Sequence, residues 1–296
     1  NSSFSDYSPT LYKDNQLVFT SDRSSATGDE KYNWTGREFY DIFVVDLNSQ
    51  NAQPFDNQIN TPFNEGTTAF SKDYSEVYFS RCGEDRKFED DYCKLMVSQV
   101  NGSSWSKPQV LPFVKEGVNY GSPALSDDGN TLYFTADDPE GWGGKDIWMV
   151  ERTPEGGWGL PQLLSRSINT PGDEMFPFVD ADTLYFSSDR HQSMGGLDIF
   201  KSYQLNGRWT PANNLRTPIN SGADDFGYVV DYDAPKEAED VLQVGYFTSN
   251  RESGQGYDDI YRFVKKVPPP PPPVDPDEEK EPIVYKINLD GYVVEK

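Results

Sequence analysis

A four-residue hydrophobic phrase recurs five times along the chain: an aliphatic residue or glycine, then Val or Tyr, then Phe, then Ser or Thr. The copies occupy 17–20, 77–80, 132–135, 184–187 and 245–248. Four are followed, after a polar stretch, by Asp-Ile and an aromatic residue, at 41–43, 146–148, 198–200 and 259–261, and the second repeat has a degenerate copy at 94–96. Repetition at a period of about 40 to 60 residues predicts neighbouring units that build one continuous core.

Two further elements complete each repeat. A short segment ahead of each phrase is joined to it by an Asp-rich turn such as 126–130, and Asp, Asn and Gly suit a hairpin because they tolerate positive φ. After most Asp-Ile phrases comes a Gly-x-Trp or Ser-x-Trp stretch and then proline, as at 103–108, 157–161 and 207–211. Proline is confined to edge strands. We therefore interpret this stretch as the outer strand of a four-stranded unit.

Four antiparallel strands per unit form the blade of a β-propeller. No long segment shows apolar positions at helical spacing, so we expect almost no helix. The prediction is an all-β, five-bladed propeller with inner strands near 7–12, 66–71, 121–126, 175–180 and 226–231. The repeated phenylalanines should occupy equivalent buried positions: Phe19, Phe79, Phe134, Phe186 and Phe247.

Asparagines mark the junctions between repeats. Asn60, Asn169 and Asn220 each follow an outer strand and lie eight residues ahead of the same inner-strand position, and Asn1 lies at that distance from Pro9. The fifth repeat ends at 263–266 without a Gly-x-Trp stretch. We expect three strands in the last blade. Its fourth strand would come from residues upstream of Asn1, from 283–294 folding back, or from a neighbouring chain, in that order.

The composition changes after residue 266. An unbroken proline run at 268–273 leads into a charged stretch that ends at Pro282. This composition is typical of an extended spacer, with a ligand for proline-reading modules as the alternative. Residues 283–294 alternate like a strand. We predict a propeller at 1–266, an acidic Pro-rich linker at 267–282 and the opening strand of a further β module at 283–296.

The 49 acidic residues outnumber the 26 basic ones, which gives a formal net charge of -23. Such a charge repels phosphate backbones and anionic lipids, so it disfavours nucleic-acid binding and a polybasic membrane role. No stretch approaches the roughly 20 apolar residues of a transmembrane helix. Residues 1–4 contain neither an initiator Met nor a hydrophobic segment, as expected for a fragment or a processed chain.

The two cysteines, Cys82 and Cys93, flank one predicted hairpin loop. Strand pairing would bring them together as a disulfide, and a structural disulfide indicates an oxidising compartment. Two free thiols in a loop are the alternative, and the sequence leaves both open.

Few residues offer catalytic chemistry. The sole histidine, His191, and two distant cysteines support neither a tetrahedral zinc site nor a Cys-His pair. No cofactor is expected, although acidic loops such as 231–233 leave structural calcium open without forming an EF-hand loop. Carboxylates are abundant, so a glycoside-cleaving pair at the mouth of the channel is the enzymatic alternative.

Polar residues that recur once per repeat are assigned structural roles, since a catalytic residue is needed only once. In the Ser-Asp-Arg phrases the short side chain would cap a turn and the guanidinium would bridge to a carboxylate or carbonyl. The Asp of each Asp-Ile phrase receives the same assignment. The residues so assigned are Asp22, Arg23, Asp41, Asp146, Asp189, Arg190, Asp198, Arg251 and Asp259.

The first two repeats carry insertions at 24–40 and 83–92, in the same hairpin of adjacent units. Both should protrude from one side of the disc. Aromatic side chains on loops over a rigid scaffold are typical of protein-binding surfaces, and the alternative is that they fold back as cover. The candidate contact residues are Tyr32, Trp34, Phe39, Tyr40, Phe88 and Tyr92.

The runs at 122–135 and 184–200 resemble the PD40, or WD40-like, repeat of TolB-type propellers, and the resemblance covers 5–266. Together with the proline linker and the strand at 289–296, it resembles OmpA-family, PorE-like envelope proteins of Bacteroidota associated with type IX secretion. In these a carboxypeptidase-regulatory-like β-sandwich follows the propeller. The resemblance implies a periplasmic, outer-membrane-associated scaffold whose partners are other envelope or secretion-system proteins. Peptidoglycan would be reached only through an OmpA-like domain outside this sequence.

We therefore expect a non-enzymatic, protein-binding scaffold propeller. The alternative is a carbohydrate-binding or glycoside-hydrolysing propeller that uses carboxylates at the channel mouth. Two unpaired carboxylates together with aromatic side chains at one mouth would favour that alternative.

Overall fold

The computed structural model describes residues 1–13, 15–24, 27, 39–83, 92–235 and 238–268. The chain divides into two units, Asn1–Lys266 and Val267–Lys296. The predictions for most of the linker and for the strand at 283–296 lie outside the described residues. The described part of the first unit consists of strands, turns and irregular segments and contains no helix. None of the described segments is a helix that could span a membrane.

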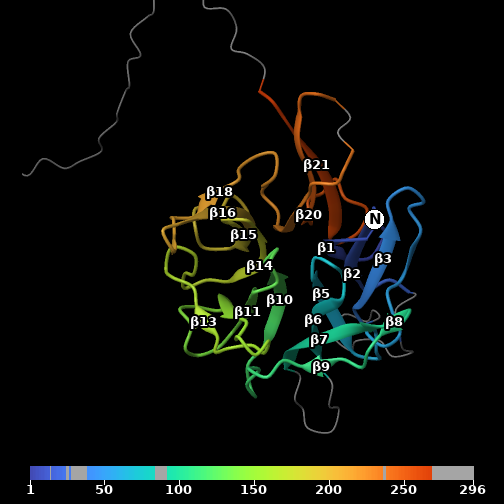
Figure 1. The fold of residues 1–296 in the computed structure, drawn as a ribbon. Helices are drawn as coiled ribbons and strands as arrows, with labels where there is room; N and C mark the ends of the chain where they lie inside the picture. Colours follow the sequence, from blue (N-terminus) through green and yellow to red (C-terminus); the bar gives the residue numbers. More distant parts are fainter. Residues whose placement is uncertain (14, 25–26, 28–38, 84–91, 236–237, 269–296) are drawn as a thin grey trace, which may run out of the picture. The chain divides into compact units, whose positions relative to one another are not determined.

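Five antiparallel sheets succeed one another around a common axis, from blue to orange-red in Figure 1. We number them blades 1 to 5 in chain order. Blade 1 contains β1 (Asp6–Tyr12), β2 (Gln16–Ser21), β3 (Asp41–Asp46) and β4 (Ala52–Pro54). Blade 2 contains β5 (Asn64–Phe70), β6 (Glu76–Cys82), β7 (Cys93–Asn101), β8 (Ser104–Trp105) and β9 (Gln109–Val110).

Blade 3 contains β10 (Tyr120–Leu125), β11 (Thr131–Ala136), β12 (Asp146–Glu151) and β13 (Gln162–Leu163). Blade 4 contains β14 (Glu174–Asp180), β15 (Thr183–Ser188), β16 (Asp198–Leu205), β17 (Arg208–Trp209) and β18 (Asn213–Asn214). Blade 5 contains β19 (Asp225–Asp231), β20 (Val241–Ser249) and β21 (Asp259–Lys266). The all-β, five-bladed propeller predicted from the repeats is confirmed.

The core lies between neighbouring blades. All five repeated phenylalanines are buried, with exposed fractions of 4% or less. Phe134, for example, packs beside Leu111 of blade 2 and Trp148 of its own blade in one apolar cluster. Because each cluster joins two adjacent sheets, no blade buries its apolar surface alone, and this is why the sequence repeats.

The outer edge of the blades differs from the prediction. Trp105 and Trp209 pair with the far ends of β7 and β16 as short hairpins, and Trp158 makes an isolated bridge to Arg152. The outer-edge strands β9, β13 and β18 come only after the prolines. Proline has no N–H to continue the ladder, so it separates the hairpin from the edge strand instead of lying within one continuous strand.

Each inner strand bends at a β-bulge beside the axis. The residue at the bulge has a positive φ in all five blades: 52° at Ser8, 41° at Thr67, 45° at Ser122, 51° at Phe176 and 62° at Gly227. This conformation is unfavourable for a non-glycine residue. Its occurrence at five equivalent positions shows that the packing of inner strands around the axis requires it.

Residues 1–6 close the ring. Asp6 N–H donates to Asp258 O at 2.8 Å, and Tyr257 N–H donates to Phe4 O at 3.3 Å. Among the described residues, blade 5 has the three strands that the sequence predicts. Of the three proposed sources for its fourth strand, residues 283–294 lie outside the described part of the chain.

Candidate functional site

Four asparagine side chains join successive blades. Asn60, Asn169 and Asn220 each accept a hydrogen bond from the N–H of the Asp-Ile isoleucine in the preceding strand, at 2.8–3.0 Å, and donate to its C=O at 2.8–2.9 Å. Asn1 makes the same pair of bonds to Ile260, at 2.9 and 3.1 Å. Each of these asparagines therefore binds one backbone N–H and one C=O of the same isoleucine, and the bonds are buried at Asn60, Asn169 and Asn220 and exposed at Asn1.

The aspartates of the Asp-Ile phrases hold the loops that precede them. Asp146 accepts from Trp142 N at 2.7 Å and Gly143 N at 3.2 Å, and Asp259 accepts from Gln255 N and Gly256 N at 2.6 and 3.0 Å. Asp198 bonds the equivalent N–H groups of its loop, and Asp41 bonds Thr27 N. Burial raises the pKa of Asp41 to about 6 and also raises the pKa of Asp146.

The Ser-Asp-Arg phrases bind the starts of the inner strands. Arg23 Nη2 lies 2.5 Å from Asp6 Oδ1, and Arg251 Nη2 lies 2.6 Å from Asp225 Oδ1 and donates to Ile219 O at 2.7 Å. The carboxylates of Asp22 and Asp189 accept from the N–H of Ser5 and Asp173, at 2.8 and 3.0 Å.

Arg190 departs from the predicted bridging role. Its side chain is 65% exposed, and its nearest ion pair is 3.9 Å, with Asp189 of the same phrase. His191 takes the equivalent place, with Nε2 2.8 Å from Ile168 O and its ring against Phe186 and Phe200. The repeat pattern alone did not reveal this exchange, because it assigns the same role to every copy.

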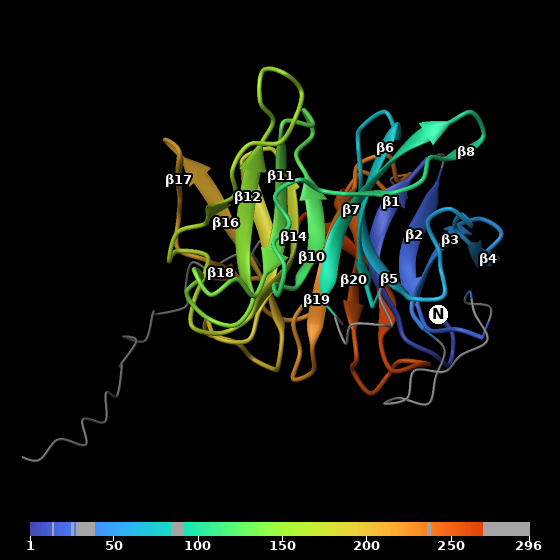
Figure 2. The same cartoon turned by 90° about the horizontal axis from the view of Figure 1, so that it is seen from below.

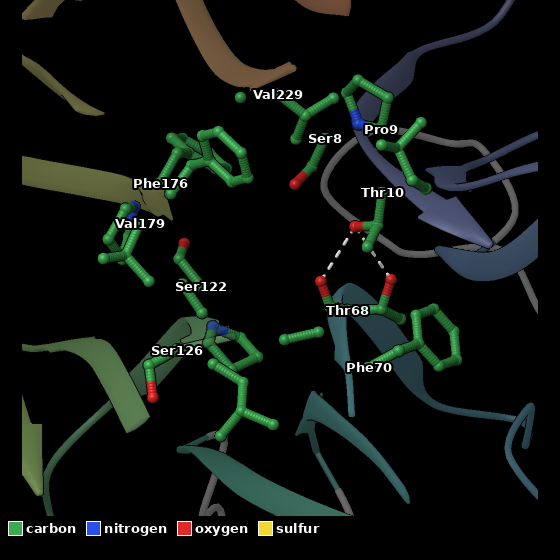
Figure 3. A pocket seen from close by; sticks show the side chains of 18 of the residues that line it. Ser8, Pro9, Thr10, Thr68, Phe70, Ser122, Ser126, Phe176, Val179 and Val229 are labelled. Carbon is green, nitrogen blue, oxygen red and sulfur yellow. Dashed lines mark hydrogen bonds between the residues drawn. The ribbon is translucent and has the colours of Figure 1, made fainter. Parts of the chain in front are cut away.

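The central channel holds a cavity of about 250 Å³, lined by residues of all five inner strands. In Figure 3 the labelled side chains surround an open centre, and the Thr10 hydroxyl donates to Thr68 O at 2.9 Å. Apolar rings and aliphatic groups such as Phe176 and Val179 alternate with the hydroxyls of Ser8 and Ser122. Most of the lining residues are therefore uncharged.

Among the described residues that line this cavity, the ionisable side chains are Lys72, Asp127, Tyr74 and Tyr228. Asp127 is exposed in the turn between β10 and β11, and burial raises the pKa of Tyr228. One exposed carboxylate can supply at most one member of the carboxylate pair that a glycosidase uses.

The side of the disc opposite the turn that holds Asp127 is the lower side in Figure 2, and it carries the described loops between the second and third strands of the blades. We call this side the loop face. Four of these loops expose one large apolar side chain: Tyr92 (40% exposed), Trp142 (43%), Met194 (43%) and Tyr257 (61%). Exposed carboxylates such as Glu140 and Asp189 lie in the same loops. Apolar groups among acids are suited to bind a partner with apolar and basic groups.

The aromatic residues predicted as contact residues in the two insertions do not all lie exposed on this face. Tyr40 is half-buried and packs edge-on against Tyr7 with ring centroids 5.5 Å apart, so it acts as cover. Phe39 is also half-buried, and Tyr92 is exposed. Tyr32, Trp34 and Phe88 lie outside the described residues. Cys82 and Cys93 are joined by a disulfide at the base of the second insertion.

Trp142, Met194 and Tyr257 were missed in the sequence. The available signal was a large apolar residue inside a polar, glycine-containing loop, as in Gly141–Trp142–Gly143. Trp142 also packs within the molecule, because the Arg166 guanidinium lies 4.2 Å from its ring centroid and its Nε1–H donates to Leu164 O at 3.4 Å, and its side chain is still 43% exposed.

Within the described part of the chain, no group of three or more His, Cys, Asp or Glu side chains is arranged to hold a metal ion. At the acidic loop considered for calcium, Asp231 Oδ1 accepts a hydrogen bond from Asp233 N at 3.1 Å.

No family model and no curated protein matches the chain. Among solved structures, the putative TolB from Agrobacterium tumefaciens is 14% identical, with a TM-score of 0.47, and the match covers 88% of this chain and 82% of that one. TolB from Acinetobacter baumannii is 14% identical, with a TM-score of 0.43 and coverage of 75% and 48%, so this chain spans about half its length.

The α-L-arabinofuranosidase from Lactobacillus brevis is 12% identical, with a TM-score of 0.49 and coverage of 88% and 90%. At such identities the likeness concerns the fold alone. A propeller fold hosts many unrelated functions, so function has to be argued from the surfaces described above.

Proposed function

We propose that this chain is a non-enzymatic, protein-binding propeller that serves as a scaffold. The observation that carries the proposal is the loop face, where four successive blades each expose one large apolar side chain among carboxylates. Tyr and Trp are enriched at protein interfaces because they combine a large apolar surface with a polar group. The partner surface would be apolar and basic.

The absence of catalysis is part of this proposal. Its support is that the repeated carboxylates already bind backbone N–H groups or arginines, as Asp146 and Asp225 do. The described lining of the channel offers one exposed carboxylate, Asp127. Turnover of chromogenic arabinosides or other glycosides by the purified chain, lost on replacing Asp127 with Asn, would favour the glycoside-hydrolysing alternative instead.

We place the scaffold in the periplasm. The disulfide between Cys82 and Cys93 supports an oxidising compartment. The resemblance of the repeats to envelope proteins extends the proposal to an outer-membrane-associated parent protein, with a component of type IX secretion as the specific case. Its partners would then be other envelope proteins.

The test is affinity capture from a cross-linked envelope extract with three forms of the chain. The first is unmodified, and the second carries Tyr92→Ser, Trp142→Ser and Met194→Ser. The third carries Leu205→Ser and Leu242→Ser, which alter side chains 61% and 51% exposed at the other ends of their strands. A partner retained by the first and third forms and lost by the second supports the proposal. Equal capture by all three forms would contradict it.

A further inference from the structure

A pocket of about 590 Å³ lies where the segment after β13 of blade 3 meets β18 of blade 4, two strands at the outer edge of the disc (Figure 1). Three arginines and the sole histidine line it: Arg166, Arg190, Arg216 and His191. None of the described lining residues is Asp or Glu. The chain as a whole has 49 acidic and 26 basic residues, so this lining departs from the composition of the molecule. A cleft lined by charges of one sign concentrates ligands of the opposite sign.

Carboxylates do not neutralise these arginines at short range. Among the described residues, Arg166 and Arg216 form no ion pair, and Arg190 forms one, with 3.9 Å between its Nε and Asp189 Oδ1. All three arginines are exposed. The arginines that bind the inner strands of blades 1, 2 and 5 differ, because each lies 2.5–2.7 Å from a carboxylate oxygen. These are Arg23, Arg81 and Arg251. The guanidinium groups of the pocket are therefore available to bind an anion.

The fold of blade 4 does not use the guanidinium of Arg190. His191 Nε2 lies 2.8 Å from Ile168 O, whereas in blades 2 and 5 an arginine donates to the equivalent C=O at 2.8 and 2.7 Å. The carboxylate of Glu174 corresponds to the one that pairs with Arg251, and it accepts hydrogen bonds from two hydroxyl groups, each at 2.7 Å. Both internal partners of the repeat arginine are thus bound by other groups in this blade, and Arg190 lines the pocket instead.

Local packing directs the arginine side chains. The Arg166 guanidinium lies 4.2 Å from the ring centroid of Trp142. The stem of Arg190 packs on Gly172, where a Cβ would collide with Arg190 Cγ. Arg216 has a φ of 61°, a conformation that is unfavourable for a non-glycine residue. A side chain that is already held in place loses less conformational entropy when a ligand binds.

The size and lining of the pocket indicate the class of ligand. A volume of about 590 Å³ falls within the range of about 300 to 1,000 Å³ that is typical of small-molecule sites. Guanidinium groups bind phosphate, sulfate and carboxylate groups through paired hydrogen bonds, and three of them suit a ligand with more than one such group. The net charge of -23 repels large polyanions such as nucleic acids at long range, which favours a small ligand.

We propose that this pocket binds a small polyvalent oxyanion, a molecule with two or more phosphate, sulfate or carboxylate groups. Arg166 of blade 3 and Arg190 and Arg216 of blade 4 bind its charged groups, so the ligand bridges two blades. Phe200, buried at the base of the pocket, provides an apolar surface. The proposal does not depend on the protein-binding role of the loop face.

The test is isothermal titration calorimetry of the purified chain with pyrophosphate, citrate and inorganic phosphate, at matched ionic strength because salt screens such contacts. The unmodified chain should bind pyrophosphate or citrate saturably and inorganic phosphate at least about ten-fold more weakly. Pyrophosphate and citrate distinguish a phosphate ligand from a carboxylate ligand. No saturable binding of either one, or equal affinity for inorganic phosphate, would overturn the proposal.

Two variants locate the binding. Arg190→Gln with Arg216→Gln should weaken it at least about ten-fold. The control carries Arg208→Gln with Lys265→Gln, which changes the net charge equally at exposed residues outside the pocket and should leave the affinity nearly unchanged. All four residues are exposed, so the unfolding temperature without anion should be the same in both variants. Equal weakening in both variants would show that only the overall charge matters, and the assignment to this pocket would be wrong.

Discussion

Asn169 is 1% exposed and makes hydrogen bonds with three buried backbone groups: the N–H and C=O of Ile147 and the C=O of Leu164. Replacing it with Ala leaves the Ile147 N–H without its acceptor, and an unsatisfied buried group costs more than one lost hydrogen bond. We expect Asn169→Ala to lower the free energy of unfolding by about 2 to 4 kcal/mol in urea titration.

Asn1 provides the matched control, because it makes the same two bonds at an exposed position. Water can replace those bonds, so Asn1→Ala should cost less than about 1 kcal/mol. Equal costs for the two substitutions would show that the buried pair of bonds contributes no more than the exposed pair.

Phe134 is 1% exposed and stacks against Phe113 with ring centroids 5.1 Å apart. Phe134→Ala removes this contact and leaves a cavity between blades 2 and 3, so the free energy of unfolding should fall by about 3 to 5 kcal/mol. Phe134→Leu preserves most of the volume and should cost clearly less. A loss under about 1 kcal/mol for Phe134→Ala would contradict the interblade core.

The same residues show what the sequence could predict. A phenylalanine that recurs in every repeat is required by the common fold, so its burial follows from repetition alone. The role of Arg190 did not follow. In blades 1 and 5 the arginine stacks on the two aromatic rings of its own blade, and in blade 4 His191 lies on Phe186 and Phe200 instead. His191, next to Arg190 in the sequence, makes the aromatic contact in its place. The repeat pattern cannot predict this because it assigns one role to each aligned position.

At the scale of elements, the inner strands were predictable because a turn that contains Asp separates each of them from the next strand. The outer edges were not, since the Gly-x-Trp stretch was interpreted as one strand, whereas proline divides it into a hairpin and a separate edge strand. The inward bulges were also missed. Their signal was proline after the bulge residue in three inner strands, at Pro9, Pro123 and Pro177.

The hairpin of β6 and β7 carries the disulfide between Cys82 and Cys93, which are separated by 11 residues in sequence. A cross-link over such a loop restricts the unfolded chain. Reduction, or Cys82→Ser with Cys93→Ser, should lower the free energy of unfolding by about 2 to 4 kcal/mol. Dithiothreitol should lower the unfolding temperature of the unmodified chain and leave that of the double variant unchanged. An equal fall in the unfolding temperature of both forms would show that dithiothreitol acts on something other than this disulfide.

At the scale of the whole molecule, the net charge and the buried carboxylates both make the folded state more stable as the pH is lowered from 7. Self-repulsion at a formal charge of -23 opposes the compact state at neutral pH. Protonating a carboxylate therefore relieves repulsion in the folded state. It stabilises that state unless hydrogen bonds or ion pairs stabilise the charged form of the same carboxylate.

Several carboxylates favour the protonated form when folded. Burial raises the pKa of Asp41 to about 6 and also raises the pKa of Glu174 and Asp258. Between the unfolded value near 4 and the folded value near 6, the folded state binds more protons, so stability falls as the pH rises. By contrast, hydrogen bonds from Ser75 and Ser71 lower the pKa of Asp73 to about 2, and that contribution is lost only below about pH 4.

The unfolding temperature should therefore rise as the pH is lowered from 7 to about 5 and fall again below about 4. Differential scanning calorimetry across this range, at constant ionic strength, measures the profile. Asp41→Asn removes a group that titrates in the upper window while keeping an acceptor for Thr27 N–H, so the rise on acidification should be smaller in that variant. A profile that falls steadily from pH 7 to 5 would show that the buried carboxylates remain charged and stabilising in the folded state.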